Sequence, residues 1–301
     1  MSAPQSPATS PTSGAPGTAG APARTRPIGI PGPVTLFASD LDRTLVYSSA
    51  ALALSMPDAD APRLLCVEVY QSKPLSYVTE AAAALLPQVA GQTVFVPTTT
   101  RTREQYGRIH LPGRVPRYAI CANGGHLLVD GVSDEDWQRD VARRLGDACA
   151  PLAEVREHLR RTAGPEWLLK ERVAEDLFCY LVVDRDRLPV SWPKELAAWC
   201  EPRGWTVSVQ GRKIYAVPRP LTKSAAVAEV ARRTGAGRTA AAGDSLLDAD
   251  LLLHADLGWR PGHGELADTG WNAPHVTALE ERGVAAGERI LQEALRLVTE
   301  N

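Results

Sequence analysis

The stretch Ser39-Asp40-Leu41-Asp42-Arg43-Thr44-Leu45 places two aspartates directly after an apolar run, residues 34–38. An apolar run of this length followed by a polar turn is typical of a buried strand. Two carboxylates at the end of such a strand repel each other unless a cation or a proton offsets their charge. The stretch therefore predicts the first strand of a sheet and a polar site at its carboxyl end.

Apolar runs and helical patterns alternate on both sides of a central segment. The predicted strands are Thr93–Val96, Tyr118–Ala122 and Thr239–Ala242, and the predicted helices are Pro74–Leu86 and Ser224–Arg233. Alternation of this kind is typical of a parallel sheet with helices on its faces. We therefore expect an α/β fold with a Rossmann-like parallel-sheet core.

The central segment has a different pattern, which predicts an α+β unit inserted into the core. It contains a helical stretch at 137–159, two strands at 167–173 and 177–183, a short helix at 194–200, and a hairpin at 205–217 around Gly211-Arg212-Lys213. Strands separated by a short turn that contains glycine are typical of antiparallel pairing. We predict a core domain formed by residues 34–125 and 218–301, with the inserted α+β domain at 126–217.

The composition restricts the class of protein. The chain has 301 residues, 44% of them hydrophobic, and a formal net charge of −2, so that no basic surface for nucleic acid or anionic membranes is expected. Five widely spaced cysteines favour buried thiols in a reducing cytosol over disulfides or zinc. Residues 1–33 are rich in Pro, Ala, Ser, Thr and Gly, which predicts a disordered tail.

Polar residues follow three of the predicted core strands. They are Asp40 and Asp42, Thr98 to Thr100, and Asp244 with Asp248. Ligands of open parallel sheets bind beyond the carboxyl ends of the strands, so these side chains are expected to share one site. A set of carboxylates without Cys or His favours Mg²⁺ over zinc. Together with a lysine, such a site suits phosphoryl transfer.

The same residues resemble the motifs of the haloacid dehalogenase superfamily, specifically its phosphatases. Asp40-Leu41-Asp42-Arg43-Thr44 is similar to motif D-x-D-x-T, and Thr99-Thr100-Arg101 is similar to the threonine motif that ends the second strand. Lys223 matches the motif-three lysine, and Asp244 and Asp248 match G-D-x-x-x-D. Asn123-Gly124-Gly125 resembles a segment of the Cof-type branch, which includes sucrose-phosphate phosphatases and carries a large α/β cap.

The resemblance implies a role for each matching residue. Asp40 would be the nucleophile that forms an aspartyl-phosphate, and Asp42 the general acid and base. Thr99 and Lys223 would hold the phosphoryl oxygens. Mg²⁺ would be bound by Asp40, the main-chain carbonyl of Asp42 and Asp244, with Asp248 acting directly or through water.

We therefore expect a Mg²⁺-dependent phosphatase of a small, sugar-phosphate-like metabolite, with no nucleic-acid or membrane partner. Three alternatives stay open: a phosphomutase or phosphotransferase, a nucleotide or phosphoribosyl-ester phosphatase, and a non-catalytic regulatory module. The sequence does not indicate an oligomeric state.

Substrate recognition is expected to involve polar residues near the motifs and in the cap, whose arginines suit a second anionic group. The candidates are Arg43, Thr100, Arg101, Asn123, Gly124, Lys170, Arg172 and Arg212, with Lys213 beside the last of them.

Overall fold

A five-stranded parallel sheet forms the centre of the computed structural model, which describes residues 34–299. Its strand order is β15 (Val276–Ala278), β14 (Leu257–Arg260), β13 (Arg238–Ala242), β1 (Thr35–Ser39) and β5 (Val94–Pro97). β1 therefore lies in the interior of the sheet, with β13 and β5 as parallel neighbours. This arrangement confirms the predicted α/β class. The predicted disordered tail lies outside the described residues.

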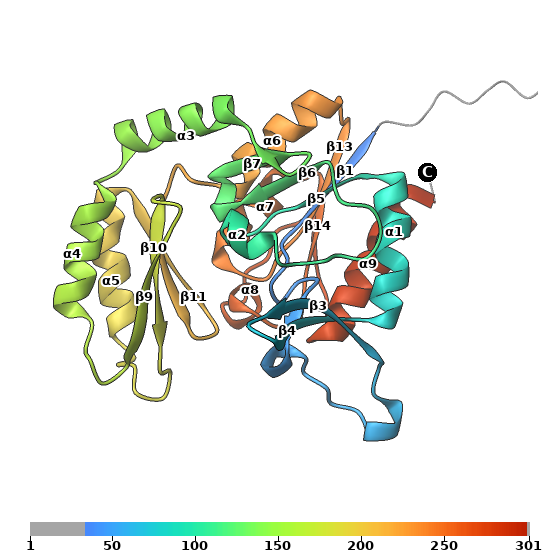
Figure 1. The fold of residues 1–301 in the computed structure, drawn as a ribbon, viewed down its shortest axis with the longest axis horizontal. Coiled ribbons are helices and arrows are strands. Elements are labelled where there is room, and N and C mark those ends of the chain that lie inside the picture. The colour runs from blue at the N-terminus through green and yellow to red at the C-terminus, as the bar shows by residue number, and fades with distance from the viewer. Residues whose placement is uncertain (1–33, 300–301) are drawn as a thin grey trace, which may run out of the picture. The chain divides into compact units, whose positions relative to one another are not determined.

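Helices cover both faces of this sheet because its strands are apolar on both sides. Phe37 packs with α1 (Glu80–Gln92) and α9 (Val284–Thr299), which lie side by side (Figure 1). Its neighbours Leu36 and Ala38 point to the other face, toward α6 (Lys223–Thr234) and α7 (Ala249–His254). Strands that are buried on both faces are typical of parallel sheets.

The inserted segment folds as a four-stranded antiparallel sheet with helices. Its order is β11 (Trp205–Gln210), β12 (Lys213–Pro218), β10 (Phe178–Val183) and β9 (Leu168–Ala174). The segment also contains α3 (Glu135–Ala148), α4 (Leu152–Thr162) and α5 (Trp192–Cys200). The predicted strands and hairpin are thus confirmed. The predicted single helix at 137–159 is two helices, since Pro151 disfavours helical backbone at the residue before it.

The predicted domain boundaries stay a prediction. The boundary at 125/126 would cut a hairpin, because β6 (Tyr118–Cys121) pairs with β7 (His126–Val129), which in turn pairs with β8 (Val132–Ser133). All described residues belong to one compact unit.

One predicted helix is partly wrong. Residues 73–79 form strand β4 (Lys73–Thr79), which pairs with β3 (Leu64–Tyr70) and with the short β2 (Tyr47–Ser48). The helix begins only at Glu80, where the Thr79 hydroxyl accepts a hydrogen bond from the Ala82 amide. The strand was hidden because its buried position 76 is a serine, whose hydroxyl donates to Glu68 of β3. A polar residue on the buried face removes the alternation that indicates a strand.

Short helical turns complete the chain near the strand ends, including α2 (Arg103–Tyr106) and α8 (Glu265–Asp268). None of the helices in residues 34–299 is long and apolar enough to cross a membrane.

Candidate active site

Three buried carboxylates meet at the carboxyl end of the parallel sheet. Asp40 follows β1, Asp244 follows β13, and Asp248 lies one turn later; each offers an oxygen within 4.8 Å of the others. The two strands are neighbours, and the Asp40 amide donates to the Ala242 carbonyl at 2.9 Å. Adjacent parallel strands therefore bring together aspartates that are about two hundred residues apart in sequence.

Lys223 supplies positive charge to this cluster. It is the first residue of α6, it is fully buried, and its Nζ donates to Asp40 Oδ1 at 2.6 Å and to Asp248 Oδ1 at 2.5 Å. Burial alone would lower the pKa of Lys223, but the carboxylates of Asp248 and Asp40 raise it above its ordinary value. The lysine is therefore a fixed cation between two carboxylates.

The second oxygen of Asp248 is also occupied. Asp248 Oδ2 accepts from the amides of Asp244 and Ser245 at 3.2 and 2.9 Å, and from the Ser245 hydroxyl at 2.7 Å. Together with the bond from Lys223, these contacts use both carboxylate oxygens. Asp248 thus holds Lys223 and the turn that carries Asp244.

Asp40 and Asp244 have less compensation for their charge. Burial raises the pKa of Asp40 to about 7, although Lys223 opposes the shift. Burial and the neighbouring carboxylates Asp40 and Asp248 raise the pKa of Asp244 well above its ordinary value, against the effect of Arg43. Burial and mutual repulsion thus disfavour the ionised form of both carboxylates, and a bound cation would offset both effects. The candidate metal ligands in this cluster are all carboxylate oxygens, which suits a hard divalent cation such as Mg²⁺.

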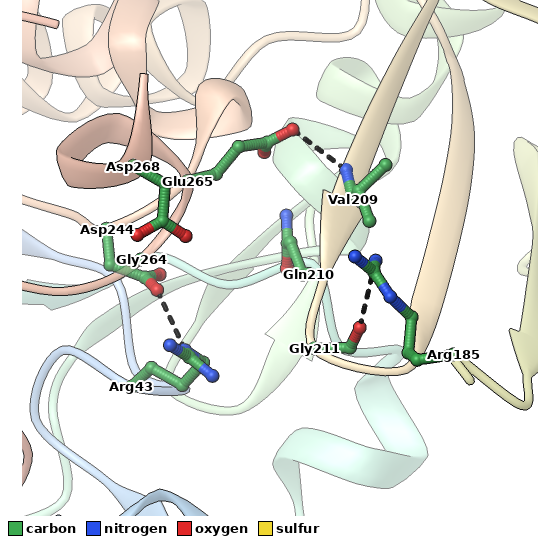
Figure 2. Close-up of a pocket in the computed structure, with 9 residues that line it drawn as sticks. All are labelled: Arg43, Arg185, Val209, Gln210, Gly211, Asp244, Gly264, Glu265 and Asp268. Atoms are coloured by element: carbon green, nitrogen blue, oxygen red, sulfur yellow. Dashed lines mark hydrogen bonds and ion pairs between the residues drawn. The ribbon is translucent and has the colours of Figure 1, made fainter. Parts of the chain in front are cut away.

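Arg43 approaches the cluster from the turn after β1. Its Nε donates to Asp244 Oδ2 at 3.1 Å, as Figure 2 shows. The residue has a φ of 66°, in the left-handed region that favours glycine. His263 holds this turn from the opposite side: its Nε2 lies 2.7 Å from the Arg43 carbonyl, while its Nδ1 accepts from the Gly283 amide at 3.1 Å. Nε2 must therefore carry the proton.

Asp42, the second aspartate of the motif, is held by Arg101. Nε and Nη2 of the guanidinium donate to the two oxygens of Asp42 at 2.7 and 2.8 Å, and Nη1 donates to Glu68 at 2.9 Å. Burial acts to raise the pKa of Asp42, but Arg101 outweighs it and lowers the pKa to about 2. Arg101, predicted to contact substrate, thus pairs with Asp42.

Two cavities open beside these residues, under the β11–β12 hairpin. The first, about 460 Å³, is lined by Arg43 and Asp244 from the core and by Gln210 and Gly211 from the hairpin (Figure 2). The second, about 500 Å³, has Asp42 and Arg101 on the core side and Arg212 and Lys213 on the hairpin side. Both cavities therefore connect the motif residues with the inserted segment.

Glu265 of α8 joins the hairpin to the core. Its carboxylate accepts from the Ser208 hydroxyl at 2.6 Å and the Val209 amide at 2.9 Å on β11, and from the Leu246 amide at 3.0 Å in the core (Figure 2 shows the bond to Val209). A second link joins Arg103 of α2 to Glu175 in the β9–β10 turn, at 3.0 Å. These links hold the antiparallel sheet over the cavities.

Other predicted residues have different positions. Thr99 and Thr100 are buried directly after β5, and the Thr99 hydroxyl accepts from the Arg101 amide at 3.1 Å. Asn123 and Gly124 support the loop before Lys223. The side-chain Nδ2 of Asn123 donates to the Leu221 carbonyl at 2.8 Å. Gly124 packs so closely against this loop that a Cβ there would lie 2.1 Å from the Thr222 carbonyl oxygen.

Lys170 and Arg172 are exposed on the edge strand β9 and line neither cavity. The roles assigned to the motif residues from the sequence stay predictions.

Sequence patterns did not identify several residues around the site. Glu68 and Ser76 belong to the hairpin whose second strand was predicted as a helix, and Arg108 reaches Glu68 from beyond α2 at 3.3 Å. His263 and Glu265 were not identified either, although both follow the fourth motif within about twenty residues. Their contacts join segments far apart in sequence, which no local pattern reports.

Comparisons with known proteins agree with this architecture. No protein-family model and no curated protein matches the sequence. Among solved structures, the sucrose-phosphatase of Synechocystis, bound to sucrose and phosphate, has a TM-score of 0.60 at 15% identity, covering 89% of this chain and 98% of that one. A Thermoplasma acidophilum protein has a TM-score of 0.56 at 11% identity, covering 87% and 98%.

A trehalose-6-phosphate phosphatase related protein has a TM-score of 0.50 at 18% identity, covering 88% of this chain and 99% of that chain. The chain therefore shares with these solved structures a fold that combines a parallel-sheet core and an inserted antiparallel segment.

Proposed function

We propose that this protein is a Mg²⁺-dependent phosphatase that hydrolyses a small, sugar-phosphate-like ester through an aspartyl-phosphate on Asp40. The observation that carries the proposal is the buried contact of Asp40 with Lys223 at 2.6 Å, in one cluster with Asp244, while Asp42, two residues after Asp40, lines the second cavity. The shared fold with a sucrose-phosphatase and a trehalose-6-phosphate phosphatase related protein supports the substrate class.

In the first step an oxygen of Asp40 attacks the phosphorus, and the bond from phosphorus to the leaving oxygen breaks. The Lys223 ammonium contacts Asp40 Oδ1, and the Thr44 hydroxyl donates to Oδ2 at 3.3 Å, so that the carboxylate is oriented for attack. The leaving oxygen takes a proton from Asp42. In the second step water attacks the phosphorus, its proton passes to Asp42, and Asp40 is released.

Arg101 determines the protonation state of Asp42. While the guanidinium is bound, Asp42 is ionised, which is the state that accepts the proton of water. To carry a proton in the first step, Asp42 must separate from Arg101. Glu68 gives the guanidinium a second carboxylate at 2.9 Å, so Arg101 keeps an ion pair when Asp42 turns away.

Mg²⁺ would be held by Asp40, Asp244 and the main-chain carbonyl of Asp42. When bound, it would offset the negative charge of the phosphoryl oxygens and of the carboxylates. Asp248 has both oxygens engaged by Lys223, Ser245 and the Asp244 amide, so we assign it to the support of the site.

The test uses the Asp40→Asn variant with p-nitrophenyl phosphate and a panel of phosphorylated sugars in Mg²⁺. We expect turnover to fall by at least a thousandfold. Acid-quenched wild-type protein should show one added phosphoryl group on the peptide that contains Asp40, by mass spectrometry. Wild-type turnover by the variant would refute the assignment of the nucleophile, and a phosphorylated sugar product instead of free phosphate would indicate transfer.

A further inference from the structure

The cavity next to Asp42 has a cationic lining on the cap side. In the proposed reaction the leaving group lies beside the side chain that protonates it, and therefore inside this cavity of about 500 Å³. Its lining includes the cations Arg43, Arg101, Arg108, Arg212 and Lys213, but only two carboxylates, Asp42 and Glu68. A cavity with this excess of positive charge favours an anionic occupant.

Only three of these five cations form ion pairs with carboxylates of the described residues. Arg101 and Arg108 are bound to Asp42 and Glu68, and Arg43 is bound to Asp244. Arg212 and Lys213, in contrast, form no salt bridge within residues 34–299. Both belong to the β11–β12 hairpin, so the cap side of the cavity carries two cations that are held in no ion pair of the described residues.

Lys213 is the more constrained of the two. Its neighbour Ile214 is buried in the hydrophobic core, so the alternation along β12 turns Lys213 and Tyr215 toward the cavity. The ammonium lies 5.5 Å from the ring centre of Tyr180 and 5.9 Å from that of Tyr215. Tyr215 and Asp42 raise its pKa above the ordinary value, so the amine is charged. Arg212 is exposed at the rim.

A neutral sugar needs a mixture of hydrogen-bond donors and acceptors, whereas cationic groups on one wall favour an oxyanion. We propose that the leaving group carries a second anionic group, a carboxylate or another phosphate, which binds Lys213 with Arg212 at the entrance. This inference rests on the proposed phosphatase function and narrows its substrate class. It replaces the expectation that Lys170 and Arg172 contact the substrate, because these residues do not line the cavity.

The test measures binding separately from turnover, with the Asp40→Asn variant, Mg²⁺ and isothermal titration calorimetry. Two pairs of probes differ only in the second group: 3-phosphoglycerate with glycerol 3-phosphate, and glucose 1,6-bisphosphate with glucose 6-phosphate. We expect the probe with the second anionic group to bind at least tenfold more tightly than its partner in at least one pair. The pair that shows the difference distinguishes a carboxylate from a phosphate.

Adding Lys213→Met to the Asp40→Asn variant should reduce the ratio of the two dissociation constants within that pair at least tenfold. Adding Lys194→Met, the same change at an exposed lysine on the helical side of the cap, should leave the ratio intact. Equal binding within both pairs would overturn the proposal, and so would an equal effect of the two lysine variants. Because nothing is hydrolysed in this assay, a failure of the phosphatase function would appear only in the turnover experiment above.

Discussion

Arg101 donates to both oxygens of Asp42, at 2.7 and 2.8 Å, and the same guanidinium bonds to Glu68 on the neighbouring hairpin at 2.9 Å. Bidentate pairing of this kind fixes the direction of a carboxylate as well as its charge. The hairpin formed by β3 and β4 thereby takes part in the orientation of Asp42 in its ionised state, in which it is the proposed general base.

Replacing Arg101 should slow the reaction without abolishing it. In Arg101→Gln, Asp42 loses the group that orients it as the base of the second step, and we expect kcat for p-nitrophenyl phosphate to fall roughly 10- to 100-fold, below the full contribution of a general base. Glu68→Gln should have a smaller effect in the same direction. Arg139→Gln on α3 is the control; wild-type kcat in Arg101→Gln would exclude the orienting role.

Removing the Asp244 carboxylate should have opposite effects on stability and on metal binding. Without a divalent cation, the crowded Asp244 has a raised pKa, so its ionised form disfavours folding and Asp244→Asn should raise the melting temperature. With millimolar Mg²⁺, the wild type should gain stability and the variant should gain much less. Thermal melts with EDTA and with Mg²⁺ measure both effects. Equal gains would show that Asp244 does not bind the ion.

Lys223 should contribute strongly to stability, because its removal leaves Asp40 and Asp248 buried without their cation. Breaking a buried ion pair costs about 3–5 kcal/mol, and we expect a loss of that size in the free energy of unfolding for Lys223→Met. The double variant Lys223→Met with Asp248→Asn should lose less than the sum of the single variants, since they share one contact. Urea unfolding without metal measures both. Strict additivity would mean that the pair is not coupled.

His263 should make stability depend on pH. Burial lowers its pKa from 6.5 to about 4, so between these values the unfolded chain binds a proton that the folded chain does not. The contribution of neutral His263 to the free energy of unfolding is complete above pH 6.5. It falls as the pH drops, by at most about 1.4 kcal/mol per pH unit. In His263→Gln the free energy of unfolding should fall less steeply over this range. Identical slopes in urea unfolding would contradict a neutral, buried His263.

The sequence predicted most of the core and the arrangement of the motif residues. Asp40 and Asp244 each follow an apolar run, and the carboxyl ends of neighbouring parallel strands lie at one edge of the sheet. The prediction was wrong at residues 73–79, where apolar residues at helical spacing belong to a strand whose buried face includes Ser76. In so short a segment the helical spacing of apolar residues cannot be distinguished from the alternation of a strand.

The sequence by itself therefore determined the α/β class, the inserted segment and the meeting of Asp40, Asp244 and Asp248, because local periodicity and strand-end positions carry that information. Lys223 was added to this group only by its resemblance to a family motif. Only the tertiary structure decided that Arg101 binds Asp42 and Glu68, that Asp248 is saturated by hydrogen bonds, and that Lys213 rather than Lys170 lines the cavity. These facts depend on how separate sheets pack against each other. Such packing joins residues without any fixed spacing along the chain.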